Sequence, residues 1–471
     1  MKRRLLAILL SLTLMLSLVP TAWAEEAESG DQPILQSDEA QPTERNDASV
    51  QAELTAAGGT LASGTYRLPK DIKLTNDITI QANTKVTIDL NGHTLNGTGK
   101  SSVIVVNGEL TVKDSSGNNS GKITGGVGYA SDGGNGGGAI SIESGGKCTL
   151  EGGTLTDNHC NGYNYNAGGV YAKGSAKFYM TGGVITQNTA NRQGGGIFGG
   201  GSSTIEISGG EISNNTAQFG GGVCYNGTMT MTGGTIKNNT AQYSDKIEGQ
   251  SWPNIMGGGI KVNSSSPLEF YGGEVSGNKA ISSNGITALG AGIYGGDIKV
   301  KGNVKVYDNK RDRDNVDENI YLDGSAMLEV VGDLNSRAQL PVTRATQTGR
   351  VTSSNGYSFD GIITADDPAL TLETRNGDLY FTKTVNPDAV ICTMQVGGQT
   401  LGYDSLSAAL ADLPSDDNVI TLRKSIDLGA QVSVPANSGA ATITTDASED
   451  VVITWEKRIV NPNIPKSKNL I

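Results

Sequence analysis

Apolar and polar residues alternate in short runs along most of this chain. Between residues 60 and 97 the apolar positions of these runs are Ile72, Leu74, Ile78, Ile80, Val86, Ile88 and Leu90. A period of two is typical of β-strands, in which successive side chains point to opposite faces. Asn91-Gly92 and Asn96-Gly97 separate the runs and indicate tight turns. The pattern therefore predicts many short strands joined by turns.

An internal repeat follows, with units that approximate GGxIxxNxA. The units begin at Gly152, Gly182, Gly209, Gly233 and Gly272. Three residues after that glycine each unit has a large apolar residue: Leu155, Ile185, Ile212, Ile236 and Val275. Six residues after it each unit has an asparagine: Asn158, Asn188, Asn215, Asn239 and Asn278. Eight residues after it each unit has a small residue: Cys160, Ala190, Ala217, Ala241 and Ala280. The constant register predicts structurally equivalent units.

Units of this kind cannot bury an apolar face alone, and they gain a core by stacking as coils of a solenoid. Stacking places like positions about 4.8 Å apart, so the apolar columns form a continuous core and the asparagines form an amide ladder. A second glycine cluster, mostly GGG followed by Ile or Val, divides each coil into short strands. A barrel or sandwich does not need one register of Asn and Ala in every unit. The sequence therefore predicts an all-β fold, a right-handed parallel β-helix.

The residue after each GGG[IV] hydrophobe is expected to point outward from the coil. This column reads Tyr171, Phe198, Cys224, Lys261 and Tyr294, and Tyr225 is adjacent to Cys224. Exposed aromatic rings on a flat sheet can stack on sugar rings. The four aromatic residues Tyr171, Phe198, Tyr225 and Tyr294 are therefore predicted to bind glycans. The alternative is a cross-strand aromatic ladder that stabilises the sheet.

The N-terminus has the features of an export signal. Lys2, Arg3 and Arg4 precede an apolar stretch at 5–18, and a small-x-small cleavage pattern ends at Ala24. We therefore predict a signal peptide at 1–24 and a mature chain without a membrane span. Residues 25–50 are polar and acidic, which predicts a disordered leader. The predicted β-helix extends over 51–385.

The segment 386–471 resembles the start of a second β-helix. Its first part predicts a short helix in which Leu406, Ala409, Leu410 and Leu413 share one face and which Pro414 ends. After the helix, Ile420, Leu422 and Ile426 repeat the spacing of Ile72, Leu74 and Ile78. We therefore predict a partial second module with the helix as its cap.

Charge and cysteine content narrow the function classes. Lys and Arg number 36 against 48 Asp and Glu, a formal net charge of −12. This balance argues against nucleic acid or anionic lipid as a partner, and it is compatible with an extracellular protein. The four cysteines are too few for a disulfide-stapled scaffold of this size. Cys148 and Cys160 occupy apolar and small columns of the repeat, as core thiols or as a mutual disulfide.

Three motifs together resemble a known group of proteins. They are the GGxIxxNxA repeat with its GGG[IV] clusters, DLNGHTLNG at 89–97, and DENIYLDG at 317–324. The chain resembles the β-helix surface proteins of gut-type Gram-positive bacteria, which belong to the pectin-lyase-like fold. The resemblance covers roughly 60–385 and implies an adhesin-like protein, secreted or held at the cell surface.

The same fold carries polysaccharide lyases and glycoside hydrolases, so catalysis is the alternative function. A hydrolase needs two carboxylates that face each other across the sugar bond, about 5 to 10 Å apart. Glu206 and Glu269 fall in one predicted column, and Glu211 and Glu274 fall in another, with a threonine between the members of each pair. This separation favours solvated surface glutamates. His93 and His159 are likewise expected at the surface.

An acidic run near the end of the repeats is the best candidate for a Ca²⁺ site. Its candidate ligands are Asp312, Asp314, Asp317 and Glu318. Lys310, Arg311 and Arg313 interrupt the run, which favours a solvated loop without metal. No other cofactor is predicted. The sequence thus predicts a non-catalytic scaffold that binds polysaccharide or cell-surface glycans, with a lyase or hydrolase as the alternative.

Overall fold

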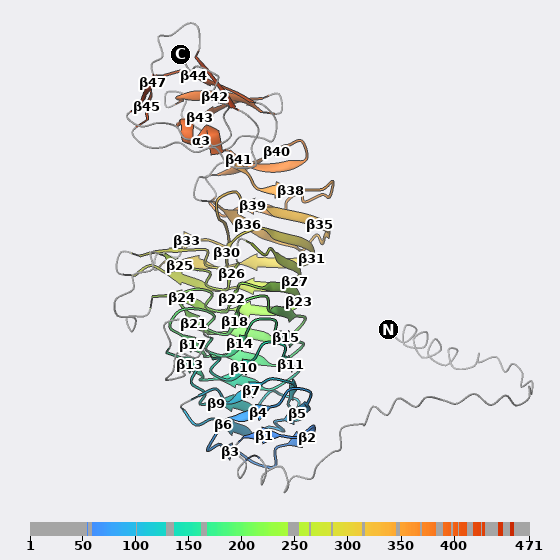
Figure 1. The fold of residues 1–471 in the computed structure, drawn as a ribbon. Helices are drawn as coiled ribbons and strands as arrows, with labels where there is room; N and C mark the ends of the chain where they lie inside the picture. Colours follow the sequence, from blue (N-terminus) through green and yellow to red (C-terminus); the bar gives the residue numbers. More distant parts are fainter. Residues whose placement is uncertain are drawn as a thin grey trace, which may run out of the picture. The chain divides into compact units, whose positions relative to one another are not determined.

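The computed structural model describes residue 54 and residues 59–99, 101–128, 136–161, 167–243, 254–262, 265–283, 286–312, 316–344, 349–367, 370–382, 390–396, 399–403, 405–411, 418–424, 426–428, 441–445 and 453–455. The predicted signal peptide and leader lie outside these residues. From β1 to β39, except for β33 and β37, strands of successive coils pair in parallel and build long sheets (Figure 1). The predicted parallel β-helix is confirmed.

Three sheets form the walls of the β-helix, and we number them one to three. Sheet one has 12 strands: β1 (Thr60–Leu61), β4 (Ile78–Ile80), β7 (Ile104–Val106), β10 (Ile140–Ile142), β14 (Val170–Ala172), β18 (Ile197–Gly199), β22 (Val223–Tyr225), β26 (Ile260–Lys261), β30 (Ile293–Gly295), β34 (Ile320–Leu322), β36 (Leu340–Thr343) and β39 (Ile363–Ala365). Sheet three has seven: β13 (His159–Cys160), β17 (Thr189–Ala190), β21 (Thr216–Ala217), β24 (Thr240–Gln242), β28 (Lys279–Ile281), β32 (Lys310–Arg311) and β33 (Val316–Asp317). Within sheet three only β32 and β33 pair antiparallel.

Sheet two is the largest, with 17 strands. They are β2 (Gly64–Arg67), β3 (Ile72–Lys73), β5 (Lys85–Asp89), β6 (Thr94–Asn96), β8 (Glu109–Lys113), β9 (Lys122–Thr124), β11 (Lys147–Leu150), β12 (Thr154–Thr156), β15 (Lys177–Met180), β16 (Val184–Thr186), β19 (Thr204–Ile207), β20 (Glu211–Ser213), β23 (Thr228–Lys237), β27 (Leu268–Ser276), β31 (Ile298–Tyr307), β35 (Leu328–Leu334) and β38 (Thr352–Ser353). Early coils contribute two strands each, which merge into one long strand from β23 onward. A small parallel pair, β25 (Asn254–Met256) with β29 (Thr287–Leu289), lies outside the three sheets.

The columns of the repeat are stacked in space. Leu155 pairs with Ile185, which pairs with Ile212, and the column continues in register through Ile236 to Val275. All five side chains are buried in one continuous core. Burial of such side chains contributes about 25 cal/mol per Å² of apolar surface, which makes this column a main source of stability.

The predicted asparagine ladder is present, and each rung donates to the next. The Nδ2 atom of Asn158 lies 3.0 Å from Oδ1 of Asn188, and the backbone N of Asn158 lies 3.1 Å from the same oxygen. The pattern continues through the rungs Asn215, Asn239, Asn278, Asn309 and Asn319. The side-chain amide of an inner rung also donates a second hydrogen bond to a backbone carbonyl. In Asn188 this bond goes to the carbonyl oxygen of Leu155 at 2.9 Å. Both donors and the acceptor of an inner rung are therefore satisfied in a buried site.

Tight bends close each coil at two kinds of position. The residue before a ladder asparagine has positive φ, as in Gln187 at 56° and Asn214 at 55°. The first glycine of the GGG cluster also has positive φ, for example 60° at Gly194. The next glycine, Gly195, has no room for a side chain, because a Cβ there would lie 2.6 Å from the backbone N of Thr216. Glycine is therefore required by the close approach of sheet three to this bend.

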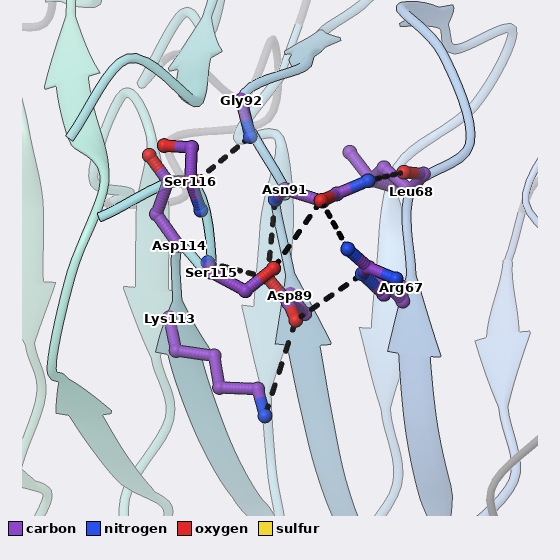
Figure 2. A network of polar contacts seen from close by, with 9 residues as sticks. All are labelled: Arg67, Leu68, Asp89, Asn91, Gly92, Lys113, Asp114, Ser115 and Ser116. Atoms are coloured by element: carbon purple, nitrogen blue, oxygen red, sulfur yellow. Dashed lines mark hydrogen bonds and ion pairs between the residues drawn. The ribbon is translucent and has the colours of Figure 1, made fainter. Parts of the chain in front are cut away.

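The DLNGHTLNG motif builds a polar network at a turn near the start of the β-helix (Figure 2). Asp89 is 3% exposed and accepts hydrogen bonds from the backbone N–H groups of Asn91, at 3.1 Å, and Ser115, at 2.9 Å. Asn91 in turn accepts from the guanidinium of Arg67 at 2.7 Å. Asp114, one coil further, accepts from Gly92 N at 2.8 Å. The motif therefore ties the turns of three coils together, a structural role.

The four cysteines are buried free thiols. Cys148 belongs to the main core, and Cys160 packs with Ala190 and Ala217 in the small column. Burial raises the pKa of the Cys148 thiol to about 12. Of the two alternatives for Cys148 and Cys160, the structure thus has core thiols and no mutual disulfide, and such thiols are unreactive.

Near the end of the β-helix some strands pair antiparallel. Strands β37 (Gly349–Arg350), β41 (Asp378–Thr382) and β40 (Thr371–Arg375) form a three-stranded sheet, and Leu379 and Phe381 of β41 join the main core. Terminal capping of this kind protects the last coil of a solenoid. The expected boundary at 385 falls outside the described residues.

The C-terminal segment contains the expected helix, described as α3 (Leu406–Ala411); Leu413 and Pro414 are not among the described residues. The strands of this segment are β42 (Cys392–Val396), β43 (Gln399–Tyr403), β44 (Asn418–Leu422), β45 (Ile426–Leu428), β46 (Ala441–Thr445) and β47 (Ile453–Trp455). The pairs β44–β46 and β45–β47 are parallel, which is the pairing that a further coil requires.

Candidate functional site

The aromatic column on sheet one is buried, which corrects the prediction of an exposed platform. Tyr171 and Tyr294 are 6% exposed, and Phe198 and Tyr225 are fully buried. Tyr171, Phe198 and Cys224 are in register on adjacent strands, and the rings of Tyr171 and Phe198 stack with centroids 5.1 Å apart. This geometry matches the alternative, a cross-strand aromatic ladder.

The physical reason is a second layer over sheet one. Tyr171, Phe198 and Cys224 form a small cluster with Ala167, and Phe219 packs against it. Ala167 and Phe219 belong to the segments that precede sheet one in their coils, so the turn of the coil covers the outward face. Tyr225 lies on the inner side, in the main core.

Tyr294 is held in a similar arrangement nearer the C-terminal end of sheet one. Its ring stacks on Tyr321 with centroids 5.3 Å apart, and its hydroxyl donates to Asp323 at 2.9 Å. None of the four predicted aromatic residues thus offers an open face to a sugar ring.

The acidic run pairs with cations of its own segment. Lys310 bonds Asp317, Arg311 NH1 lies 3.0 Å from Oε1 of Glu318, and Arg311 Nε lies 3.7 Å from Asp312. Among the residues that the structure describes, no three His, Cys, Asp or Glu side chains gather as metal ligands. Asp314 lies outside those residues.

Glu318 is the most perturbed acid of this run and is 1% exposed. Burial raises its pKa to about 7, although the nearby charge of Arg311 and a hydrogen bond from the backbone N–H of Gly290 act in the opposite direction. A buried, paired carboxylate of this kind is not open to a substrate, so we assign it a structural role.

The glutamates of the two carboxylate columns on sheet two also bond to neighbouring side chains. Glu211 lies 2.8 Å from Nζ of Lys237, and Glu274 accepts from the hydroxyl of Tyr307 at 2.6 Å. Glu269 accepts from Thr230 at 3.1 Å. The register places a threonine between Glu206 and Glu269, as the repeat predicted. These pairings give the glutamates a role in holding adjacent coils together.

A hollow of about 410 Å³ lies over sheet three. His159, Thr189 and Thr216, from β13, β17 and β21, stand in direct register across three coils and line it. Each of these residues follows a ladder asparagine, and because β-strand side chains alternate, it points away from the ladder. Stacked strands place the three side chains about 4.8 Å apart. The core thus fixes a regular row of polar side chains on the outer face.

Amide side chains and one aromatic ring complete the hollow. Asn161 and Asn191 line it beside the row, and the side chain of Asn191 donates to the carbonyl of Asn161 at 2.9 Å. Gln242 and Tyr243 line it from the end of β24. Tyr243 also packs on a cluster formed by Ala241, Ile255, Ala280, Ala288 and Ala291, which holds its ring in place.

The lining can donate and accept hydrogen bonds but carries little charge. Within the described part of the chain, the side chains of His159, Thr189 and Thr216 make no hydrogen bond to protein. Threonine hydroxyls and side-chain amides can both donate and accept hydrogen bonds, and so can a neutral imidazole. Among the residues that the structure describes, no carboxylate, lysine or arginine lines the hollow. Such a surface fits a ligand rich in hydroxyl groups.

Sequence reasoning placed His159 at the surface but missed the hollow. The signal was a further column of the repeat: nine residues after the first glycine stand Asn161, Asn191, Gln218 and Gln242. Of these, Asn161, Asn191 and Gln242 line the hollow, whereas Gln218 is 0% exposed and donates to the carbonyl of Asn254 at 3.1 Å. The column therefore indicates polar positions but not which of them reach solvent. Tyr243 stands ten residues after the first glycine, where the other units have Gly162, Arg192, Phe219 and Ser282, so the repeat does not single out this position.

The comparisons add no relative to this picture, since no family model, curated protein or solved structure matches the chain. No helix in the described ranges is long and apolar enough to span a membrane. The function must therefore be argued from the geometry of the β-helix and its hollow.

Proposed function

We propose that the protein is a secreted or cell-surface β-helix scaffold, adhesin-like and non-catalytic, that binds glycans on the outer face of sheet three. The observation that carries the proposal is the hollow, in which a regular row of polar side chains crosses three coils beside a fixed aromatic ring. Export is supported by the basic and apolar pattern of residues 2–24.

The stacked core supports a binding role because it fixes the row before a ligand arrives. Ladder asparagines Asn158, Asn188 and Asn215 directly precede His159, Thr189 and Thr216, and they are 0–1% exposed with their amides bonded to one another. A surface that is already ordered loses little conformational entropy on binding, which favours affinity.

The charge of the lining supports binding over catalysis. Glycoside hydrolysis uses two facing carboxylates, and lyase chemistry needs a base beside acidic Ca²⁺ ligands. The described side chains that line the hollow include neither a carboxylate nor a lysine or arginine. Bonds of the Glu211 and Glu274 carboxylates to Lys237 and Tyr307 give these acids a structural explanation.

The test is a glycan array probed with the labelled full chain, followed by titration calorimetry on the glycans that bind. We expect binding to polysaccharide or cell-surface glycans without any change in the glycan. Incubation with the same polymers and with pectin, with Ca²⁺ present, is expected to give no new reducing ends and no unsaturated products. Release of such products, or failure to bind any glycan, would overturn the proposal.

A further inference from the structure

We infer that the hollow on sheet three takes an uncharged oligosaccharide, aligned with the stack of coils so that successive sugars contact His159, Thr189 and Thr216. This inference rests on the proposed function and names the ligand class and its direction. Three observations support it: the composition of the lining, the register of the three strands, and the pairing of β17 with a neighbouring strand on each side.

The composition of the lining selects against charged sugars. An anionic uronate or sulfated sugar needs a cation or several donors to offset its desolvation, and an arginine or lysine normally supplies them. The cations of this column, Lys279 and Lys310, come only after Thr240, in coils that do not line the hollow. Hydroxyl and amide groups instead match the neutral hydroxyls of a sugar.

The register of the row sets the direction of the ligand. Polar side chains repeat about every 4.8 Å along the stack, which is close to the length of one pyranose unit in an extended chain. A chain that runs along the stack therefore meets an equivalent partner in each coil. A chain that runs across the coils would pass from the row to Asn161 or Asn191 and then leave the hollow.

Tyr243 supplies the apolar part of the recognition. Sugar rings have an apolar face that packs on aromatic rings, and Tyr combines this surface with a polar hydroxyl. The ring is half-buried and packs on Ala241 and Ile255. It therefore forms a rigid wall at the end of the row where the terminal sugar would stack.

A peptide is a poorer match than a sugar chain at this place. Peptides that bind sheets add a strand to an unpaired edge. Strand β17 pairs with β13 on one side and β21 on the other, and His159 of β13 also bridges to Val127. The backbone groups under the hollow are thus already bonded within the β-helix.

The test measures the affinity of the full chain for neutral oligosaccharides of glucose, mannose, xylose or galactose, from disaccharide to pentasaccharide. Oligogalacturonates and oligoalginates of equal length are the anionic comparison. We expect affinity for a neutral series to rise up to about three sugars, one for each coil of the row, and then to level off. Preference for the anionic series, or affinity independent of length, would overturn the inference.

Variants locate the site. Thr189→Val and Thr216→Val keep the shape of the side chain and remove the hydroxyl, and each is expected to weaken binding about fivefold. Tyr243→Ala is expected to weaken it about tenfold, whereas Tyr243→Phe keeps the stacking surface and most of the affinity. Thr149→Val, on the outer face of sheet two, is the matched control and is expected to bind like the wild type.

The outcomes separate the two proposals. A glycan that binds the wild type, Thr216→Val and Tyr243→Ala equally well would overturn this inference and leave the proposed function standing. A wild type that binds no glycan at all would overturn both. Circular dichroism of each variant shows whether the coils are intact, and Thr189→Val and Thr216→Val test the row even if Tyr243→Ala does not fold.

Discussion

Asn319 donates its side-chain amide to the carboxylate of Asp366, with 2.6 Å between Nδ2 and Oδ1, and its backbone N lies 2.9 Å from Oδ2. Thr343 donates to the same carboxylate at 2.7 Å. Every rung of the ladder donates to the next, so the last rung needs a partner that accepts without donating. An ionised carboxylate meets this need. Asp366 therefore terminates the amide ladder.

Replacement of this terminator is expected to destabilise the last coils. In Asp366→Asn one carboxylate oxygen becomes an amide donor that faces another donor, so a buried hydrogen bond is lost. We expect the free energy of unfolding to fall by about 2 kcal/mol, measured by urea denaturation. Asp360→Asn, at an exposed residue of the same region, is the control. Equal stability of the two variants would contradict the role of Asp366.

The pH dependence of stability is expected to reveal Glu318. Its folded pKa, about 7, is above the ordinary value of 4.5, mainly because of burial. The folded state therefore holds this proton more tightly than the unfolded state does, and the contribution of Glu318 to stability is lost as pH rises from about 4.5 to about 7. We expect the stability of the wild type relative to Glu318→Gln to fall across this range by about 3 kcal/mol.

The measurement for Glu318 is a series of urea denaturations of both proteins from pH 4 to pH 8. Taking the difference between them removes the contribution of titrating groups that do not interact with Glu318. A difference that rises with pH, as for a carboxylate whose folded pKa is lowered, would show that the pairing with Arg311 outweighs burial.

The bend before each rung offers a reciprocal pair of substitutions. Gln187 and Asn214 occupy equivalent positions with φ near 55°, and asparagine tolerates this left-handed region better than glutamine. We expect Gln187→Asn to stabilise the protein and Asn214→Gln to destabilise it, each by about 0.5 to 1 kcal/mol. Thermal unfolding of both variants checks the signs. Shifts in the same direction would mean that side-chain contacts, not backbone strain, decide these positions.

The glycine clusters allow a sharper contrast. In Gly195→Ala the new Cβ meets backbone atoms of Thr216 and Gly221, which cannot move without separating two coils. We expect a loss of more than about 3 kcal/mol, as for a severely overpacked core. Gly324→Ala is the matched control, because φ there is 55° but nothing lies within 4 Å of the added Cβ. Its expected cost is only about 1 kcal/mol, from backbone strain.

Much of the fold could be read from side-chain periodicity. Leu155, Asn188 and Ala217 were assigned to three separate columns, and each column is stacked as the register required. The termination of the ladder could not be read in this way. Asn319 and Asp366 stand outside the repeat, and they meet only because the chain returns to the same corner after two further coils.

The candidate site shows the same division between local and tertiary information. The sequence by itself determined which side chains point inward and which point outward, because strand alternation and coil stacking fix both. Only the tertiary structure decided which outward side chains reach solvent. Phe198 points outward but is buried in a cluster against which Phe219, from a turn of the next coil, packs, whereas Thr189 points outward from sheet three and lines the hollow. Whether an outward side chain is shielded depends on which turn packs over it, and the position of the turn is decided by packing between coils.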